Sequence, residues 1–179
     1  MEIRISGFGG QGIIMMGMVL GKAAAIYDNK FATLTQSFGP EARGGACSAQ
    51  LVISETKVLY PYLTAPDILV AMSQEAYHKF EATLKENGFL LIEEDLVRPH
   101  VPRPDVRQFS IPATRIAEQL GNRMFANMVM LGFLCAITAV VPLAAISQAL
   151  PGLVPDRLLD QNLKALTKGH ELGQQKLSG

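Results

Sequence analysis

The chain has few of the side chains that hold metal ions or clusters. Its 179 residues include only two cysteines and three histidines. Cys47 and Cys135 lie far apart, and neither belongs to a Cys-x-x-Cys spacing. Because zinc and iron–sulfur sites need several such ligands at characteristic spacings, we predict that this chain binds no metal. If an iron–sulfur cluster takes part in the function, another chain holds it.

Charged residues are also scarce, and their signs cancel. Only 18% of the residues are charged, with sixteen acidic and sixteen basic side chains. A chain without net charge has no overall field to attract nucleic acid or an anionic membrane, so we expect neither partner. Apolar residues make up 49% of the chain, which is high for a free-standing domain of this size. This composition favours a subunit of a larger complex.

The N-terminus lacks the pattern of a secretion signal. The first residues predict a strand, and they contain no basic region followed by an apolar core, as a secretion signal would. We therefore expect a cytoplasmic protein whose thiols stay reduced.

No apolar run is long enough to favour a membrane span. Residues 124–155 contain no formal charge, but their continuous apolar run is only about 14 residues long. A helix needs roughly 20 apolar residues to cross a bilayer. We predict a buried or interface helix over 123–141, with part of 124–155 as contact surface. Because exposed apolar patches promote association, we expect the isolated chain to self-associate or to be poorly soluble.

Short apolar segments alternate with helical segments through most of the chain. A continuous apolar run such as 67–72 is typical of a strand that is buried on both faces. The alternation predicts an α/β fold: a three-layer, mainly parallel, Rossmann-like sheet with helices on both faces. We expect strands over 2–6, 31–36, 46–53, 67–72, 89–92 and 106–111, and helices over 11–27, 73–85, 112–120, 123–141, 143–150 and from 156.

We expect one irregularity in this sheet and one domain in the chain. Ser54–Lys57 resembles a hairpin turn, so we predict that strand 46–53 pairs with a short strand over 58–60. With its length and no low-complexity linker, the chain 1–179 is expected to form a single domain, whose C-terminal helices begin at about residue 143.

The most informative segment is a glycine-rich turn between the first strand and the first helix. Gly7, Gly9, Gly10 and Gly12 fit the pattern Gly-x-Gly-x-x-Gly. Such a turn exposes the first amide groups of a helix to an anion, and glycine lets a ligand approach the backbone. The alternative is that these glycines only allow close packing of strand and helix. A dinucleotide site is less favoured, because strand 31–36 ends without an acidic residue for a ribose.

A second glycine-rich segment, Ser37–Gly45, follows the second strand. The carboxyl ends of strands one and two are expected at the same edge of the sheet, which would bring Arg43 near the first turn. There its guanidinium could bind a phosphate or a carboxylate in a bidentate manner. Alternatively, Glu41 pairs with Arg43 and only stabilises the loop. The residues by themselves leave both roles open.

Together, the two turns resemble the gamma subunit, or gamma domain, of the 2-oxoacid:ferredoxin oxidoreductases. The resemblance rests on Gly-Phe-Gly-Gly-Gln-Gly-Ile over 7–13 and on Ser-Phe-Gly-Pro-Glu-Ala-Arg-Gly-Gly over 37–45. Residues 66–76 and 121–132 also fit the pattern of this family. The resemblance covers most of residues 1–135, and Gly-Pro-Glu-Ala-Arg-Gly-Gly is its most specific part.

The resemblance implies a role within a larger enzyme. Members of this family oxidatively decarboxylate a 2-oxoacid to an acyl-CoA and pass two electrons singly to ferredoxin. Thiamine diphosphate and iron–sulfur clusters are held by partner alpha, beta and delta subunits or domains. The gamma subunit helps to bind coenzyme A and is expected to supply no catalytic residue. By this resemblance, the candidate cofactor-binding residues are Gly7, Gly9, Gly10, Gln11, Gly12, Gly39, Glu41, Arg43 and Gly44.

Two alternatives remain beside this interpretation. One is a free-standing nucleotide- or dinucleotide-binding oxidoreductase domain, and the other is the small subunit of an indolepyruvate oxidoreductase. The segment 39–43 favours the general 2-oxoacid branch, because the indolepyruvate branch lacks Pro-Glu-Ala there. The sequence does not identify the 2-oxoacid substrate, which can be pyruvate, 2-oxoglutarate or a branched-chain 2-oxoacid. A separate gamma chain of this size slightly favours 2-oxoglutarate or a branched-chain acid.

Two other residues invite a catalytic interpretation that we do not favour. Cys47 follows the second turn, but no histidine is near it in sequence, so we predict a buried small residue rather than a nucleophile. His78 falls on an amphipathic helix and is expected to be a surface residue rather than a base.

Overall fold

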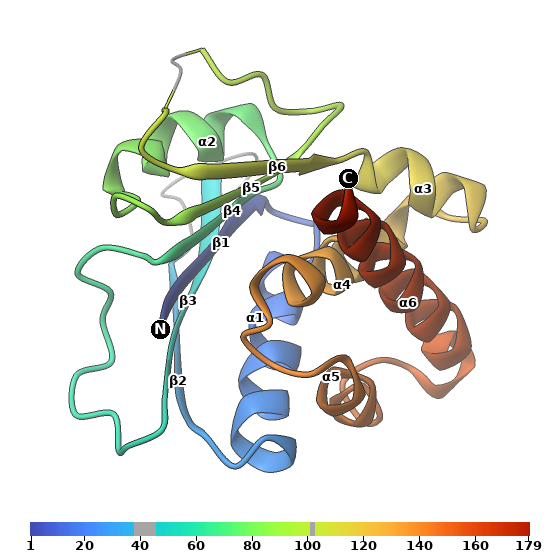
Figure 1. Ribbon diagram of the computed structural model, residues 1–179. Helices are drawn as coiled ribbons and strands as arrows, with labels where there is room; N and C mark the ends of the chain where they lie inside the picture. Colours follow the sequence, from blue (N-terminus) through green and yellow to red (C-terminus); the bar gives the residue numbers. More distant parts are fainter. Residues whose placement is uncertain (38–45, 101–102) are drawn as a thin grey trace.

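A six-stranded mixed sheet forms the centre of the protein in the computed structural model, which describes residues 1–37, 46–100 and 103–179 (Figure 1). Its strands are β1 (Glu2–Phe8), β2 (Phe31–Ser37), β3 (Ala46–Ser54), β4 (Ile68–Ala71), β5 (Phe89–Glu93) and β6 (Arg107–Ile111). Their order across the sheet is β2-β3-β1-β4-β5-β6. The pairs β1–β4, β4–β5 and β5–β6 are parallel, whereas β3 runs antiparallel to both of its neighbours.

Helices cover both faces of this sheet. They are α1 (Ile13–Lys22) with its π-helical extension η1 (Ala23–Tyr27), α2 (Gln74–Phe80), η2 (Glu81–Thr83), α3 (Ala113–Gln119), η3 (Arg123–Phe125), α4 (Ala126–Thr138), α5 (Leu143–Ala149) and α6 (Asp156–Ser178). In Figure 1, α2 lies on one face, and α1, α4 and α6 lie on the other. Alternate residues of β4 divide between two cores: Ile68 and Val70 in the larger one, Leu69 and Ala71 in the one under α2. The expected three-layer α/β fold is confirmed.

Some helix ends follow local sequence signals. Ser73 caps α2 by accepting a hydrogen bond from the Ala76 amide at 3.3 Å. Gly121, with φ at 111°, adopts the left-handed conformation just after α3. The helix expected through Lys85 is shorter, because regular hydrogen bonding ends at Phe80 and only the 3-10 turn η2 follows.

The predicted hairpin between 46–53 and 58–60 is wrong. Residues 58–60 form no strand, and Leu59 among them is 87% exposed. β3 pairs instead with β2 on one side and with β1 on the other. Because both edges of β3 already have a hydrogen-bonded neighbour, no edge is left for the segment that follows it.

The uncharged helix α4 belongs to the core. Eleven of its residues are buried, and the helices that contact it are α1, α3, α5 and α6. Of the two predicted possibilities, a buried or an interface helix, the buried one is therefore confirmed for α4. The part of 124–155 that was expected to provide contact surface does not include this helix, since the chain covers it itself. Met124, which precedes α4, is an exception with 54% of its surface exposed. Among the described residues, no helix combines the length and apolar character that a membrane span requires.

Helices α4 and α6 touch backbone to backbone. A Cβ atom at Gly132 would overlap the carbonyl oxygen of Leu166, and one at Gly169 would overlap the carbonyl oxygen of Val129. Any side chain at either position would therefore push the two helices apart. This reciprocal pair of glycines allows α6 to cover α4 closely.

We expect Gly169→Ala to destabilise the chain. Helix propensity alone favours alanine by about 1 kcal/mol, but the overlap with backbone forces the helices apart and costs about 1–3 kcal/mol or more. The net loss is measured by urea unfolding of the chain. Gln174→Ala, an exposed position on the same helix, is the control and should change stability by less than about 0.5 kcal/mol. A Gly169→Ala chain as stable as the control would contradict the close helix contact.

Candidate functional site

A cavity of about 490 Å³ opens at the carboxyl ends of β1 and β4. The helix after β1 packs in the larger core, whereas the helix after β4 packs in the core on the opposite face. In an open α/β sheet, such a divergence creates a crevice in which ligands bind. The described residues that line this cavity are Gly9, Gly10, Gln11, Met72, Leu96, Thr114, Asn122, Arg123, Met124 and Ala126.

The four glycines of the first turn have two different roles. Gly7 and Gly12 are packing positions: a Cβ at Gly7 would overlap a neighbouring side chain, and one at Gly12 would overlap the side-chain amide of Asn127 on α4. Gly9 and Gly10 face open space, since no heavy atom of the described residues lies within 4 Å of a Cβ there. Thus the packing interpretation fits Gly7 and Gly12, and the backbone at Gly9 and Gly10 is left accessible to a ligand.

Gln11 links the ends of the two central strands. Its Oε1 accepts a hydrogen bond from the Phe8 amide at 2.7 Å, and its Nε2 donates to the Met72 carbonyl at 2.9 Å. The side chain therefore ties the turn after β1 to the residue after β4. The structure brings Gln11 to the cavity, where this pair of hydrogen bonds fixes the position of Gly9 and Gly10.

The N-terminus of α1 adds a local preference for anions. Within the described part of the chain, no side chain caps this end, and the first turn of the helix contains no acidic residue. The first amide groups of a helix lack intrahelical partners and carry a partial positive charge. An anionic group beside Gly9–Gly12 is stabilised by this charge.

Sequence reasoning missed the cation at this cavity. Arg123 in η3 is exposed and has no ion pair with any described residue. Asn122 shapes this turn, because its Oδ1 accepts a hydrogen bond from the Met124 amide at 2.9 Å. A signal was available: Arg123 is the last charged residue before the uncharged stretch 124–155, and it lies two residues after the helix-ending Gly121.

A buried carboxylate positions another part of the cavity lining. Glu93, at the end of β5, is fully buried and accepts hydrogen bonds from the Leu96 amide at 2.7 Å and the Thr114 amide at 3.0 Å. Both donors belong to residues that line the cavity. Because a buried carboxylate requires such partners, Glu93 fixes the loop after β5 against the start of α3. Sequence reasoning did not identify this positioning residue either.

Four predicted binding residues lie outside the described residues: Gly39, Glu41, Arg43 and Gly44. On either side of them, β2 ends at Ser37 and β3 begins at Ala46, which pairs with Phe8 at the end of β1. The carboxyl ends of β1 and β2 thus share an edge of the sheet, but β3 lies between them. This separates the glycine turn from the strand end that carries the ribose-binding acid in dinucleotide folds.

The described structure places Cys47 and His78 as expected. Cys47 and Cys135 are buried. Burial raises the pKa of the Cys47 thiol above its ordinary value, and it raises the pKa of the Cys135 thiol to about 12. Such thiols are weak nucleophiles at neutral pH. His78 lies exposed on α2, with Gln74 at 2.7 Å from its ring. Three or more His, Cys, Asp or Glu residues arranged to hold a metal do not occur in the described parts of the chain.

Comparisons with known proteins agree with one another. A family model described as pyruvate ferredoxin/flavodoxin oxidoreductase matches residues 2–172. The 2-oxoglutarate synthase subunit KorC of Methanocaldococcus jannaschii is 48% identical over 176 residues, which cover 97% of this chain and 94% of that protein. The crystal structure of a keto/oxoacid ferredoxin oxidoreductase gamma subunit from Geobacter sulfurreducens has a TM-score of 0.86 and 38% identity over 99% of each chain.

A larger enzyme contains a similar unit. The 2-oxoglutarate:ferredoxin oxidoreductase from Magnetococcus marinus, solved with 2-oxoglutarate, coenzyme A and succinyl-CoA bound, matches with a TM-score of 0.87 and 25% identity. The match covers 98% of this chain and 31% of that one. The fold described above thus occurs both as a separate chain and as part of a longer chain.

The two kinds of glycine should respond differently to the same substitution. Gly12→Ala places a Cβ against Asn127 and needs φ at 74°, so it should lower stability by about 1–3 kcal/mol. Gly9→Ala meets no described atom and should change stability by less than about 0.5 kcal/mol. Thermal and urea unfolding of the two variants make this comparison. Equal losses would refute the division into packing and open positions.

Proposed function

The chain belongs to the pyruvate ferredoxin/flavodoxin oxidoreductase family, and from this premise we propose that it is the gamma subunit of a complex that oxidises 2-oxoglutarate. The reaction converts 2-oxoglutarate and coenzyme A to succinyl-CoA and CO₂, with two electrons passed to ferredoxin. The 48% identity to a 2-oxoglutarate synthase subunit along nearly the whole chain favours this substrate over other 2-oxoacids. Thiamine diphosphate and the iron–sulfur clusters belong to partner alpha, beta and delta chains in this proposal.

The part assigned to this chain is to bind and orient coenzyme A. Coenzyme A carries phosphates at one end and a long, weakly polar arm that leads to the thiol. The cavity beside Gly9 and Gly10 offers matching chemistry: accessible backbone, the N-terminus of α1, the guanidinium of Arg123 and the exposed side chain of Met124. The single observation that best supports the proposal is that Arg123 lines the same crevice between β1 and β4 as the accessible backbone of Gly9 and Gly10.

The remaining residues of the site have supporting roles. Gln11 holds the glycine turn, and Glu93 holds the wall formed by Leu96 and Thr114. Arg43, which lies outside the described residues, is proposed from the sequence to bind phosphate, and Arg123 is proposed from its place at the cavity. No residue of this chain is assigned a proton-transfer step. The chain contributes binding, orientation and exclusion of water, and the chemistry takes place on groups that its partners hold.

A free-standing dinucleotide-binding domain is the weaker proposal. It requires an acidic group beside the glycine turn to bind a ribose. Strand β3 occupies the place next to β1 on that side, and β2 ends at Ser37 without an acid.

In the assembled complex, Arg123→Ala should raise the KM for coenzyme A about tenfold to a hundredfold. The loss of a charge-assisted phosphate contact costs roughly 1.5–3 kcal/mol. The KM for 2-oxoglutarate should change by less than about twofold, because the substitution removes only binding of the other substrate. Steady-state kinetics with each substrate varied in turn provide the measurement.

Arg157→Ala, an exposed arginine on α6, is the matched control and should leave both KM values unchanged. Arg43→Ala should act in the same direction as Arg123→Ala. An unchanged KM for coenzyme A in an intact Arg123→Ala complex would exclude this cavity as its binding site.

The isolated chain should show no decarboxylase activity and should bind neither iron nor thiamine diphosphate in stoichiometric amount. Two cysteines are too few for the four thiolates of a cluster. Absorbance spectra, metal analysis and cofactor analysis after desalting test this. Iron–sulfur absorbance that survives desalting would contradict the assignment of clusters to other chains.

A further inference from the structure

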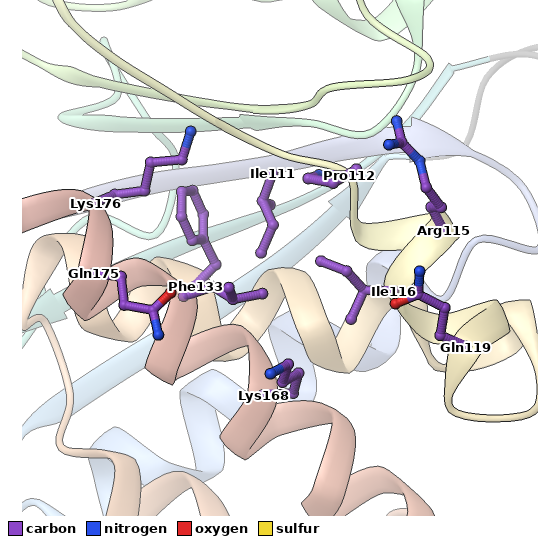
Figure 2. Close-up of a pocket in the computed structure, with 10 residues that line it drawn as sticks. Ile111, Pro112, Arg115, Ile116, Gln119, Phe133, Lys168, Gln175 and Lys176 are labelled. Atoms are coloured by element: carbon purple, nitrogen blue, oxygen red, sulfur yellow. The ribbon is translucent and has the colours of Figure 1, made fainter.

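A second hollow, which we call the α3–α6 groove, lies between α3 and α6, next to the cavity proposed for coenzyme A. Its volume is about 450 Å³. Figure 2 shows Ile111, Ile116 and Phe133 gathered between α3 and α6. All three are nearly fully buried, so the groove has a firm apolar floor. Thr114 lines the cavity and Arg115 lines the groove, so neighbouring residues of α3 face the two hollows.

The walls of the groove are two helix faces. On α6 the lining residues Lys168, Leu172 and Gln175 follow the i, i+4, i+7 spacing of one helix face. On α3 and its start, Pro112, Ile116 and Gln119 are spaced in the same manner. At 1.5 Å per residue, each wall is roughly 10–12 Å long, which equals about two turns of a third helix. Amphipathic helices commonly bind with their apolar face in an apolar groove of this kind.

The rim of the groove is positively charged. Arg115, Lys168 and Lys176 are exposed around it, and no carboxylate occurs among the described residues that line it. Arg115 is paired with Asp95, and Lys168 lies 3.9 Å from Glu171, so part of this charge is already neutralised. Lys176 has no ion pair with a described residue. The rim therefore favours a partner with acidic residues beside an apolar stripe.

We propose that the α3–α6 groove binds an amphipathic helix of a partner subunit, with apolar residues at i, i+3 or i+4 and i+7 and acidic residues on its flanks. The apolar residues pack on Ile116, Phe133 and Leu172, and the acidic residues pair with Lys168 and Lys176. This inference rests on the proposed function, in which the chain acts within a complex. Docking there also fixes α3, and with it the wall of the coenzyme A cavity at Thr114.

Cross-linking in the assembled complex tests the identity of the occupant. Gln119→Cys and Gln175→Cys, each carrying a benzophenone maleimide, place a photoreactive group at the groove, while both native cysteines are buried. We expect cross-links to one helical peptide of a partner subunit that has the stated pattern. Gln174→Cys, exposed on α6 but outside the lining, is the control and should give at least tenfold less of this product. Equal yield from the control would overturn the proposal.

Other occupants give different products. Cross-links to a second copy of this chain, or to a loop or strand of a partner, would also overturn it. So would native mass spectrometry that finds a small amphiphile retained by the complex, with no protein cross-link at either position.

Charge reversal tests the role of the rim. Lys168→Glu with Lys176→Glu should raise the apparent Kd for assembly at least tenfold, measured by titrating the chain into a complex prepared without it. Arg157→Glu with Lys164→Glu makes the same change in charge on α6 outside the groove and should stay within twofold of wild type. Equal effects of the two pairs would show that the rim has no specific role.

The two proposals can fail separately. In complexes formed at saturating concentration, the rim variants should keep the wild-type KM for coenzyme A within twofold. Loss of coenzyme A binding without loss of assembly would place these lysines in the other site and overturn the groove proposal. An unchanged KM in Arg123→Ala would overturn only the coenzyme A site.

Discussion

The backbone contact between α4 and α6 supports the rest of this structure. Helix α4 has no charged residue, so it must be enclosed, and the reciprocal contacts of Gly132 and Gly169 let α6 cover it closely. The position of α4 also fixes the position of its first residues, where Asn127 packs against Gly12 of the glycine turn. The preceding turn η3 is fixed with them, and it places Arg123 at the cavity. The site therefore depends on a helix contact that contributes no atom to it.

The reversed strand β3 determines what kind of site the crevice can be. In a fully parallel sheet, the second strand lies beside the first and presents its end to the glycine turn. Here β3 occupies that place and enters the sheet at the same edge that β1 and β2 leave. The segment between Ser37 and Ala46 therefore begins and ends at the edge of the sheet near the glycine turn. The glycine turn therefore lacks the neighbouring strand end that carries the ribose-binding acid in dinucleotide folds.

Helix α3 connects the two regions to which we assign functions. It is anchored through Glu93, whose buried carboxylate accepts a hydrogen bond from the Thr114 amide. Thr114 lines the cavity proposed for coenzyme A, and the next residue, Arg115, lines the α3–α6 groove. A partner that packs in the groove contacts the same short helix that forms the cavity wall. If both proposals hold, assembly and coenzyme A binding are linked through this one helix.

The sequence by itself predicted the features that depend on neighbouring residues: the six strand positions, the cap at Ser73, the helix end at Gly121, the glycine turn and, through that turn and Gly39–Arg43, the family. What it missed depends on contacts between distant segments. Packing decides the direction of β3, the division of Gly7 and Gly12 from Gly9 and Gly10, and the arrival of Arg123 at the cavity. For α4, the sequence left open whether the helix is buried or at an interface, and packing decided for burial. The sequence contains the same glycine whether a ligand or a side chain such as Asn127 occupies the space that a Cβ would take. Only the tertiary structure therefore shows which of the two is there.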